Sequence, residues 1–145
     1  MSSPQRPVDP DYAQRVRTNF AAQRVMATLG AQLVEIGAGV VAIELPYREE
    51  LTQQDGFLHA GIVATVLDSA CGYAAFTLMP AGAGVLTVEY KINLLAPAVG
   101  HSLLARAEVA RAGRTLTVVR GQATARSDGG EKTVAIMQAT VMAIG

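Results

Sequence analysis

The sequence has a single cysteine, no tryptophan and no excess of charge of either sign. One cysteine cannot form an internal disulfide or a multi-cysteine metal cluster. Twelve basic residues balance twelve acidic ones, and no polybasic tract is present, so the chain lacks the basic footprint of a nucleic-acid-binding protein and shows no sign of membrane recruitment. Residues 1–7 lack the apolar core of a secretory signal, and we expect a cytoplasmic protein.

Charged residues are scarce as well, at 17% of the chain, while half of the residues are hydrophobic. This composition argues against disorder. A chain of 145 residues usually forms one domain and can bury roughly two-thirds of its unfolded surface. Residues 1–10 contain three prolines, and we expect a flexible lead-in there, followed by a single domain over residues 11–145.

The longest apolar segment, residues 60–79, contains one charged side chain, Asp68. A helix that is apolar on all sides is normally buried, so this segment predicts a central helix with Leu58 or His59 as its N-cap and Pro80 just beyond its end. The segment is long enough to cross a bilayer. Its central carboxylate, its small residues and the patterned chain on both sides favour a helix wrapped by its own protein.

The flanking periodicity predicts an antiparallel sheet around this helix. One or two short helices are expected within residues 11–29, ended by Gly30, with Arg15, Arg17 and Arg24 facing solvent. Strands are expected over residues 31–36, 40–45, 85–94, 101–110, 115–126 and 131–144.

We expect the last four strands to form a meander, and residues 85–94 to be half-buried because apolar and polar side chains alternate there. Arg106, Glu108, Arg120, Gln122 and Gln138 should form the polar exterior, with Ala105, Ala107, Ala123 and Ala139 packing inward. A single sheet of this kind has exposed edges, which predicts dimerisation by edge pairing.

Asp68 is the first candidate for chemistry, because a lone carboxylate in an apolar helix needs a partner. Helical spacing places it on a face of small residues, including Gly61, Thr65 and Gly72. Two interpretations are open: a structural carboxylate bonded to Thr65, Ser69 or a backbone group, or a group that acts on a substrate.

The start of the helix is the second candidate. Free N–H groups near His59 and Ala60 could hold an oxyanion, with Gln53 just upstream; His59 by itself is better explained as a cap or loop contact than as a catalyst. Asp68 lies nine residues beyond His59, roughly 13 Å along the axis, too far for both to touch one reacting carbon. If both act on one bond, the site combines two chains.

Other reactive residue types have simpler explanations. Cys71 has no basic neighbour in sequence to activate it and is expected in the core. Ser69 lacks the Gly-x-Ser-x-Gly elbow of serine hydrolases. His101 has no other candidate ligand near it, so no metal site is expected, and Arg114 fits a solvated turn.

Together these residues resemble the hotdog-fold thioesterases of the phenylacetyl-CoA (PaaI-like) type, from about Gly30 to the end of the chain. That family shows Asn or Gln six residues before a His-Gly-Gly motif, and Asp or Glu nine residues after the His. Gln53, His59 and Asp68 match this spacing, as do the strand over residues 87–93 and the turn at 113–116.

The resemblance implies an α+β hotdog fold, with a six-stranded antiparallel sheet around one long helix, that hydrolyses an acyl-CoA thioester. Asp68 would be the general base or nucleophile, and the Ala60 N–H would polarise the carbonyl. Gln53 would orient substrate or water, Thr87 would help to hold the water, and His59 would act in positioning.

The resemblance also implies contacts of Gly61 and Arg114 with substrate or CoA, and no metal or redox cofactor. Ala60 departs from the usual first glycine and narrows the pocket by about a methyl group. Gly72 stands where a hydroxybenzoyl-CoA branch has threonine, which disfavours that substrate.

We therefore expect hydrolysis of a medium-chain or aromatic acyl-CoA by a homodimer or a dimer of dimers (a homotetramer), with the active site between subunits. A non-catalytic acyl-CoA binding or sensing module on the same fold is the alternative. A hotdog dehydratase is a third possibility, although its usual His-rich signature is absent.

Overall fold

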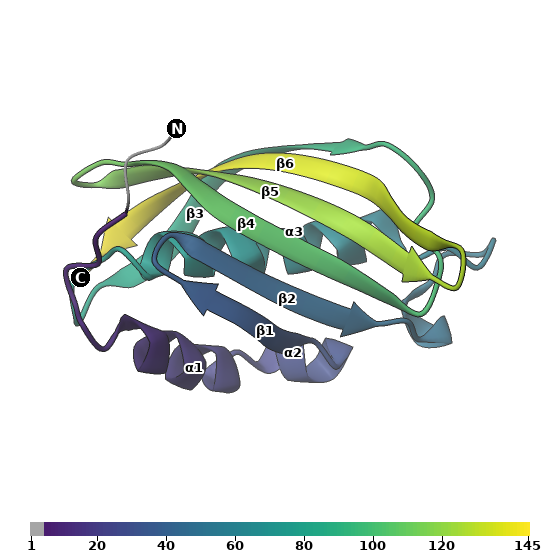
Figure 1. Cartoon of the computed structure of the whole chain (residues 1–145), viewed down its shortest axis with the longest axis horizontal. Coiled ribbons are helices and arrows are strands. Elements are labelled where there is room, and N and C mark those ends of the chain that lie inside the picture. The colour runs from purple at the N-terminus through teal and green to yellow at the C-terminus, as the bar shows by residue number, and fades with distance from the viewer. Residues whose placement is uncertain (1–4) are drawn as a thin grey trace.

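The computed structural model describes residues 5–145, in which a six-stranded antiparallel sheet curls around one long helix (Figure 1). The helical elements are α1 (Tyr12–Ala22), α2 (Arg24–Leu29), the 3-10 turn η1 (Glu49–Leu51) and α3 (Ala60–Phe76). The strands are β1 (Gln32–Gly37), β2 (Val40–Pro46), β3 (Gly84–Leu94), β4 (Ser102–Ala112), β5 (Leu116–Ser127) and β6 (Gly130–Ile144). This arrangement confirms the expected α+β architecture.

The predicted lead-in over residues 1–10 falls partly outside the described residues, which begin at residue 5. Within the described part, the Asp9 carboxylate pairs with Arg15 of α1 at 2.9 Å. Two helices separated at Gln23 fill residues 12–29, and α2 ends at Gly30 in the left-handed conformation, with φ 74°. The short helices and their glycine stop are therefore confirmed, while the domain boundary at residue 11 stays a prediction.

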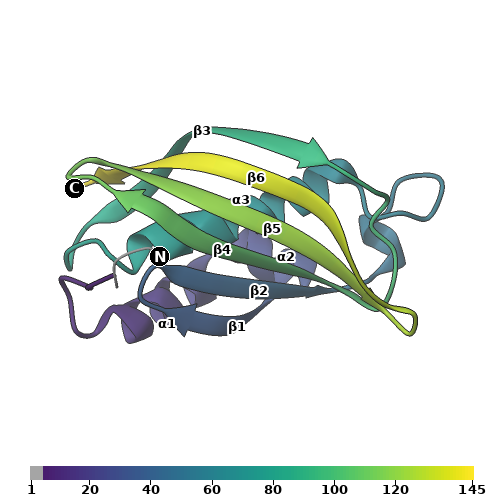
Figure 2. The same ribbon diagram turned by 45° about the horizontal axis from the view of Figure 1, so that its top comes forward.

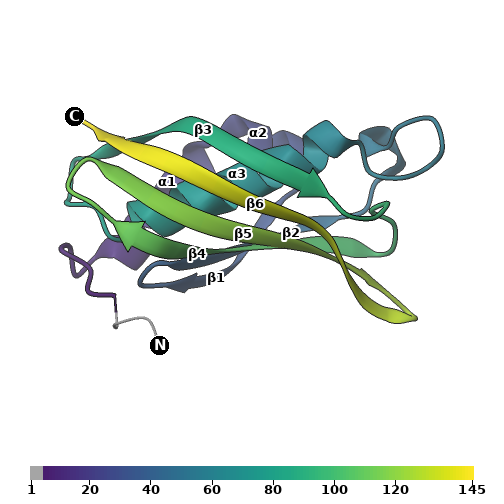
Figure 3. The same cartoon turned by 90° about the horizontal axis from the view of Figure 1, so that it is seen from above.

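The sheet order is β1-β2-β4-β5-β6-β3, so the predicted four-strand meander is wrong at one place. Strands β4, β5 and β6 are consecutive neighbours, but β3 pairs with β6 at the far edge, and β4 pairs with β2 (Figure 3). The chain leaves α3 to form one edge of the sheet and then crosses back. Alternation in a sequence reports which face of a strand is buried and carries no information about its neighbours.

The inner face of the sheet is lined with small side chains that let α3 come close. All four inward-facing alanines that the alternation predicts are buried, and the five predicted polar residues on the outer face are exposed. At Gly121 of β5, an added Cβ would lie 3.0 Å from the Cys71 sulfur and 3.1 Å from Leu67 Cδ2. A side chain at this position would press against α3, so the glycine suits the close approach of the helix to the sheet.

Helix α3 ends at Phe76, three residues before the predicted stop at Met79. The Thr77 hydroxyl donates to the Ala74 carbonyl at 2.7 Å and accepts from the Gly39 N–H at 2.8 Å. This side chain ties the end of the helix to the β1–β2 turn, so the chain turns before the Met79-Pro80 signal.

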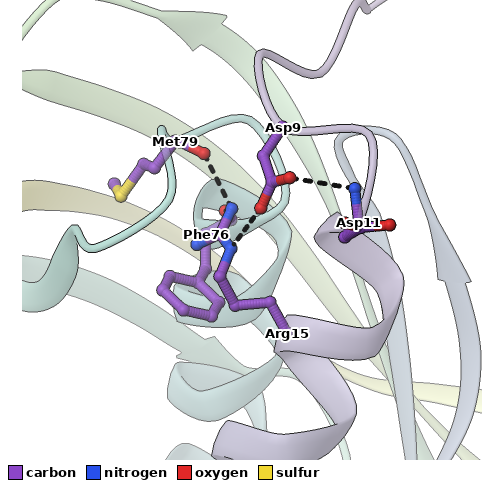
Figure 4. Close-up of polar contacts among 5 residues, drawn as sticks. All are labelled: Asp9, Asp11, Arg15, Phe76 and Met79. Atoms are coloured by element: carbon purple, nitrogen blue, oxygen red, sulfur yellow. Dashed lines mark hydrogen bonds and ion pairs between the residues drawn. The ribbon is translucent and has the colours of Figure 1, made fainter.

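Arg15 does not face solvent as its position in α1 predicts. Its side chain is only 17% exposed and donates to the carbonyl oxygens of Phe76 at 3.3 Å and Met79 at 2.7 Å (Figure 4). Its guanidinium carbon also lies 4.3 Å from the centre of the Phe76 ring. A cation at a helix C-terminus is favourable because carbonyls there lack partners, so Arg15 fixes α1 to the end of α3.

Two further burial predictions are wrong for the single chain. The second half of α3 is buried, but Ala60 and Gly61 are exposed and Asp68 is half-buried. On β3, where we expect a half-buried strand, Tyr90 is 45% exposed and Leu94 52%. The reason is that β3 is an edge strand whose free side has no neighbour (Figure 2).

Candidate active site

The start of α3 presents one free backbone donor. His59 is the N-cap, and its Nδ1 accepts the Gly61 N–H at 2.8 Å. The next two N–H groups, of Ile62 and Val63, donate to the His59 carbonyl. Within residues 5–145 the Ala60 N–H has no partner, so the sequence-predicted oxyanion donor is the one that remains available.

His59 is therefore a helix cap, which is one of the interpretations that the sequence allowed for this residue. Because its Nδ1 accepts a backbone hydrogen bond, the neutral ring carries its proton on Nε2. The exposed Nε2–H is a donor, which suits a positioning residue better than a general base.

The loop before α3 is held tightly by its own polar groups. The Gln53 side-chain oxygen accepts the N–H groups of Asp55 at 2.6 Å and Phe57 at 3.2 Å. The Tyr47 hydroxyl donates to the Gly56 carbonyl at 2.7 Å; no sequence signal pointed to this residue. The Gln53 side-chain nitrogen has only a long contact, 3.5 Å, with Asp55, so this N–H group is the part of Gln53 that a ligand could use.

Asp68 is bound by one residue from the neighbouring strand. The Thr87 hydroxyl of β3 donates to Asp68 Oδ1 at 2.8 Å. Neither predicted structural partner is used, since Thr65 donates to the Gly61 carbonyl and Ser69 to Gln23. Among the described residues Oδ2 has no hydrogen-bond partner, so the carboxylate is oriented on one side and open on the other.

The predicted site residues form three separate groups in one chain. Gln53, His59, Ala60 and Gly61 lie at the start of α3, and Asp68 with Thr87 lies roughly 13 Å along the helix at ~1.5 Å per residue. Arg114 is exposed in the β4–β5 turn, beside the C-terminal end of β6. That end of the sheet is separated from the start of α3 by the length of β3, on the order of 30 Å.

Cys71 and Tyr73 of α3 are core residues. Burial, with a smaller contribution from the Asp68 charge, raises the pKa of the Cys71 thiol to about 12. Burial likewise raises the pKa of Tyr73 to about 12, and its hydroxyl donates to Asn19 of α1 at 3.0 Å. A thiol with such a pKa stays protonated near neutral pH, so Cys71 is not an activated nucleophile.

Among the described residues, the best-defined hollow does not lie at the candidate site. A hollow of about 720 Å³ lies instead on the outer face of the sheet, lined by residues including Arg106, Arg120 and Gln138, and no candidate site residue takes part in it. No helix in the described part of the chain is both long enough and apolar enough to span a membrane. The candidate residues of a single chain therefore lie along the open surface of α3 and β3.

Comparison with known proteins gives the family. Residues 55–132, which include the start of α3, Asp68 and Thr87, match the thioesterase superfamily. The chain belongs to the thioesterase superfamily. The expected enzyme class, thioester hydrolase, is thereby confirmed.

Individual relatives agree with this assignment. A thioesterase family protein from Silicibacter pomeroyi is 59% identical, with a TM-score of 0.90 over 92% of this chain and 98% of that one. Human acyl-coenzyme A thioesterase 13 is 31% identical over 98 residues, 67% of this chain and 69% of the relative. The Escherichia coli PaaI protein is 19% identical, with a TM-score of 0.83 over 93% and 94% of the two chains, and shows the shared hotdog fold.

Proposed function

We propose that this thioesterase hydrolyses a medium-chain or aromatic acyl-CoA in the cytoplasm, at a site formed between two copies of the chain. One observation carries the proposal: Asp68 has an oriented carboxylate with one free oxygen, and the start of α3 has one free N–H, at Ala60. Thioester hydrolysis needs both groups, a base or nucleophile and an oxyanion donor.

The reaction follows from these two groups. The Ala60 N–H has no competing acceptor among the described residues, and it donates to the thioester carbonyl oxygen, which becomes negative when the carbonyl carbon is attacked. Asp68 removes a proton from a water molecule, and the oxygen of that water bonds to the carbonyl carbon. The tetrahedral intermediate then expels the CoA thiolate, which takes up a proton, and leaves the free acid. In the alternative route an Asp68 oxygen attacks the thioester carbon and the CoA thiolate leaves, which gives an anhydride; water then cleaves this anhydride to the free acid and the restored Asp68 carboxylate.

The remaining residues support this chemistry. Thr87 holds Asp68 and, through its hydroxyl, positions the attacking water. His59 shapes the start of the helix by binding the Gly61 N–H, and its Nε2–H and the Gln53 side-chain N–H are the donors left for the substrate. Arg114 contributes positive charge for the CoA phosphates.

The distance between the two groups supports a dimer. Antiparallel pairing of two β3 edges, with the two-fold axis at Glu89 in the middle of the strand, would bring Thr87 of a second copy opposite Lys91. This position is about 13 Å along the strand from the first Thr87, at ~3.3 Å per residue. Asp68 of one copy thereby approaches the helix start of the other.

The same pairing accounts for the exposed surface of β3. It would cover the free edge of the strand and the apolar side chains of Val88, Tyr90 and Leu94, which are exposed in the single chain. It also brings the β4–β5 turn of one copy, with Arg114, to the end of the molecule where α3 of the other copy begins. A dimer of dimers, the homotetramer expected from the sequence, would form from this unit.

The proposal is tested by Asp68→Asn, with Asp128→Asn in the exposed β5–β6 turn as the matched control. Thiol release from a panel of acyl-CoAs should fall by at least about 100-fold in the first variant and stay near the parent rate in the second. Near-parent turnover in folded Asp68→Asn would contradict the mechanism. Tight acyl-CoA binding without turnover by the parent protein would instead favour a binding or sensing module.

Solvent-label incorporation separates the two routes. A single turnover in ¹⁸O water labels only the product acid if Asp68 acts as a base. It leaves the label on Asp68 if this residue is the nucleophile and water attacks the aspartyl carbonyl of the anhydride.

A further inference from the structure

The loop between η1 and α3 projects at the end of the molecule where α3 begins, and it carries Gln53 (Figure 3). The base of this loop is fixed through the backbone, because the Leu58 N–H donates to the Ala98 carbonyl at 2.9 Å. Its tip is held by a side chain: the Tyr47 hydroxyl donates to the Gly56 carbonyl at 2.7 Å. Tyr47 therefore ties the outer part of the loop to the end of β2.

One peptide group connects Tyr47 to Gln53. Its carbonyl, that of Gly56, accepts the Tyr47 hydroxyl, and its N–H, that of Phe57, donates to the Gln53 side-chain oxygen at 3.2 Å. This peptide bond is trans, so the group is planar and its C=O and N–H turn together. A hydroxyl that fixes the carbonyl thereby fixes the N–H, and with it the oxygen of the Gln53 side chain.

This peptide group would turn easily without such a bond. Gly56 has φ 86°, and an added Cβ there would meet no heavy atom within 4 Å, so neither a side chain nor crowding restrains the peptide that follows.

Tyr47, in contrast, is a fixed point of the fold. Its backbone N–H donates to the His101 carbonyl at 2.9 Å, next to the pairing of Pro46 with Ser102. Its half-buried ring packs against the hydrophobic core. The hydroxyl therefore holds a mobile peptide group to a rigid part of the sheet.

We propose that Tyr47 is a positioning residue that orients the Gln53 side chain toward the substrate, a role that rests on the proposed function because it gives the free Gln53 side-chain N–H to the thioester. The Gln53 oxygen accepts two backbone N–H groups, those of Asp55 and Phe57, and these two bonds fix the direction of the N–H. Loss of the Tyr47 hydroxyl releases the Gly56–Phe57 peptide group and with it one of the two bonds. Gln53 then turns about the remaining bond, and part of the preorganisation of the site is lost.

Tyr47→Phe removes the hydroxyl and keeps the ring. With phenylacetyl-CoA or octanoyl-CoA, whichever the parent hydrolyses faster, kcat/KM should fall by about 3- to 10-fold, the value of one neutral hydrogen bond. Tyr12→Phe, at the start of α1 near the other end of the molecule, is the matched control and should leave kcat/KM unchanged (Figure 1).

A double-mutant cycle with Gln53→Glu separates positioning from general support of the fold. Glutamate keeps an oxygen for the two backbone N–H groups and removes the side-chain N–H. In this background Tyr47→Phe should change kcat/KM by less than about 2-fold, because no donor is left to position. An equal loss of kcat/KM from Tyr47→Phe in both backgrounds would overturn the inference.

A spectroscopic measurement separates this inference from the proposed function, because it requires no turnover. The NMR signal of the Gln53 side-chain amide is assigned by its absence from Gln53→Glu. Tyr47→Phe should shift or broaden this signal and speed hydrogen exchange at the Phe57 N–H. The side-chain amide of Gln122, which donates to Thr133 on the sheet, should not change.

The two readouts fail independently. A shifted Gln53 signal supports the coupling of Tyr47 to Gln53 even if the parent hydrolyses neither ester, a result that would refute only the proposed function. Hydrolysis by the parent together with an unchanged Gln53 signal in Tyr47→Phe refutes the coupling and leaves the proposed function intact.

Discussion

A proline at residue 60 would remove the proposed oxyanion donor and leave the helix in place. Ala60 is the first residue of α3, the position where helices accept proline because its N–H has no intrahelical partner. The preceding residue must be extended, and His59 already has φ −59° and ψ 138°. Ala60→Pro should therefore fold normally, and losing one oxyanion-hole donor should lower kcat by about 100- to 1,000-fold.

Mixing this variant with Asp68→Asn tests whether the site spans two chains. In a mixed dimer, one site joins the intact Ala60 of the first copy to the intact Asp68 of the second, and the other site lacks both. Random exchange of equal amounts gives half mixed dimers, so about a quarter of all sites should be active. The two variants alone should be nearly inactive.

The two variants, each with its own tag, are unfolded together and refolded. Thiol release from an acyl-CoA by this mixture is then compared with thiol release by each variant treated alone in the same way. Ala64→Pro, in the second turn of α3, is the comparison for Ala60→Pro. A proline inside the helix breaks it and should prevent folding, whereas a proline at the first position should not. If the mixture is no more active than the separate variants while a pull-down shows mixed dimers, the site lies within one chain. In that case the 13 Å argument is wrong.

Three further predictions concern single residues. Thr87→Val should lower kcat/KM by about 10- to 100-fold, because a hydrogen bond to the charged Asp68 is worth about 1.5–3 kcal/mol; an unchanged rate would assign Thr87 a structural role only. Arg15→Ala should lower the free energy of unfolding by about 3–5 kcal/mol, against ~0.5 for exposed Arg17→Ala, and urea denaturation measures both. Cys71 should react with iodoacetamide at neutral pH only after unfolding, because its pKa in the fold is about 12; rapid labelling of the native protein would contradict its burial.

The secondary structure was predictable from local signals because each element follows from its own residues. The apolar run starting at Ala60, the alternation in four strands and the stop at Gly30 are local properties, and the structure reproduces them. The errors arise where a distant segment intervenes. Arg15 is buried because the end of α3 lies beside it, and α3 ends early because Thr77 binds the β1–β2 turn; neither contact leaves a periodic trace.

The candidate site was predictable in its residues but not in its contacts. Spacing identified Asp68 and the helix start, while the Thr87 hydroxyl was expected only through family resemblance. Its bond to Asp68 depends on β3 lying beside α3, which requires the crossover after α3. Tyr47 carries no signal in the sequence, because only the folded loop brings its hydroxyl to the Gly56 carbonyl.

Two of the wrong burial predictions concern neighbouring elements, α3 and β3, and this has a physical meaning. The alternation of β3 and the apolar character of α3 are what a fully covered strand and helix require, yet in one chain Tyr90 and the first two residues of the helix, Ala60 and Gly61, are exposed. Exposed apolar surface on an edge strand is costly and prone to aggregation unless something covers it. The composition of these two segments therefore fits side chains that are buried in an assembly of chains. Because the same surface carries Asp68 and Thr87, covering it with a second copy would complete both the fold and the proposed site.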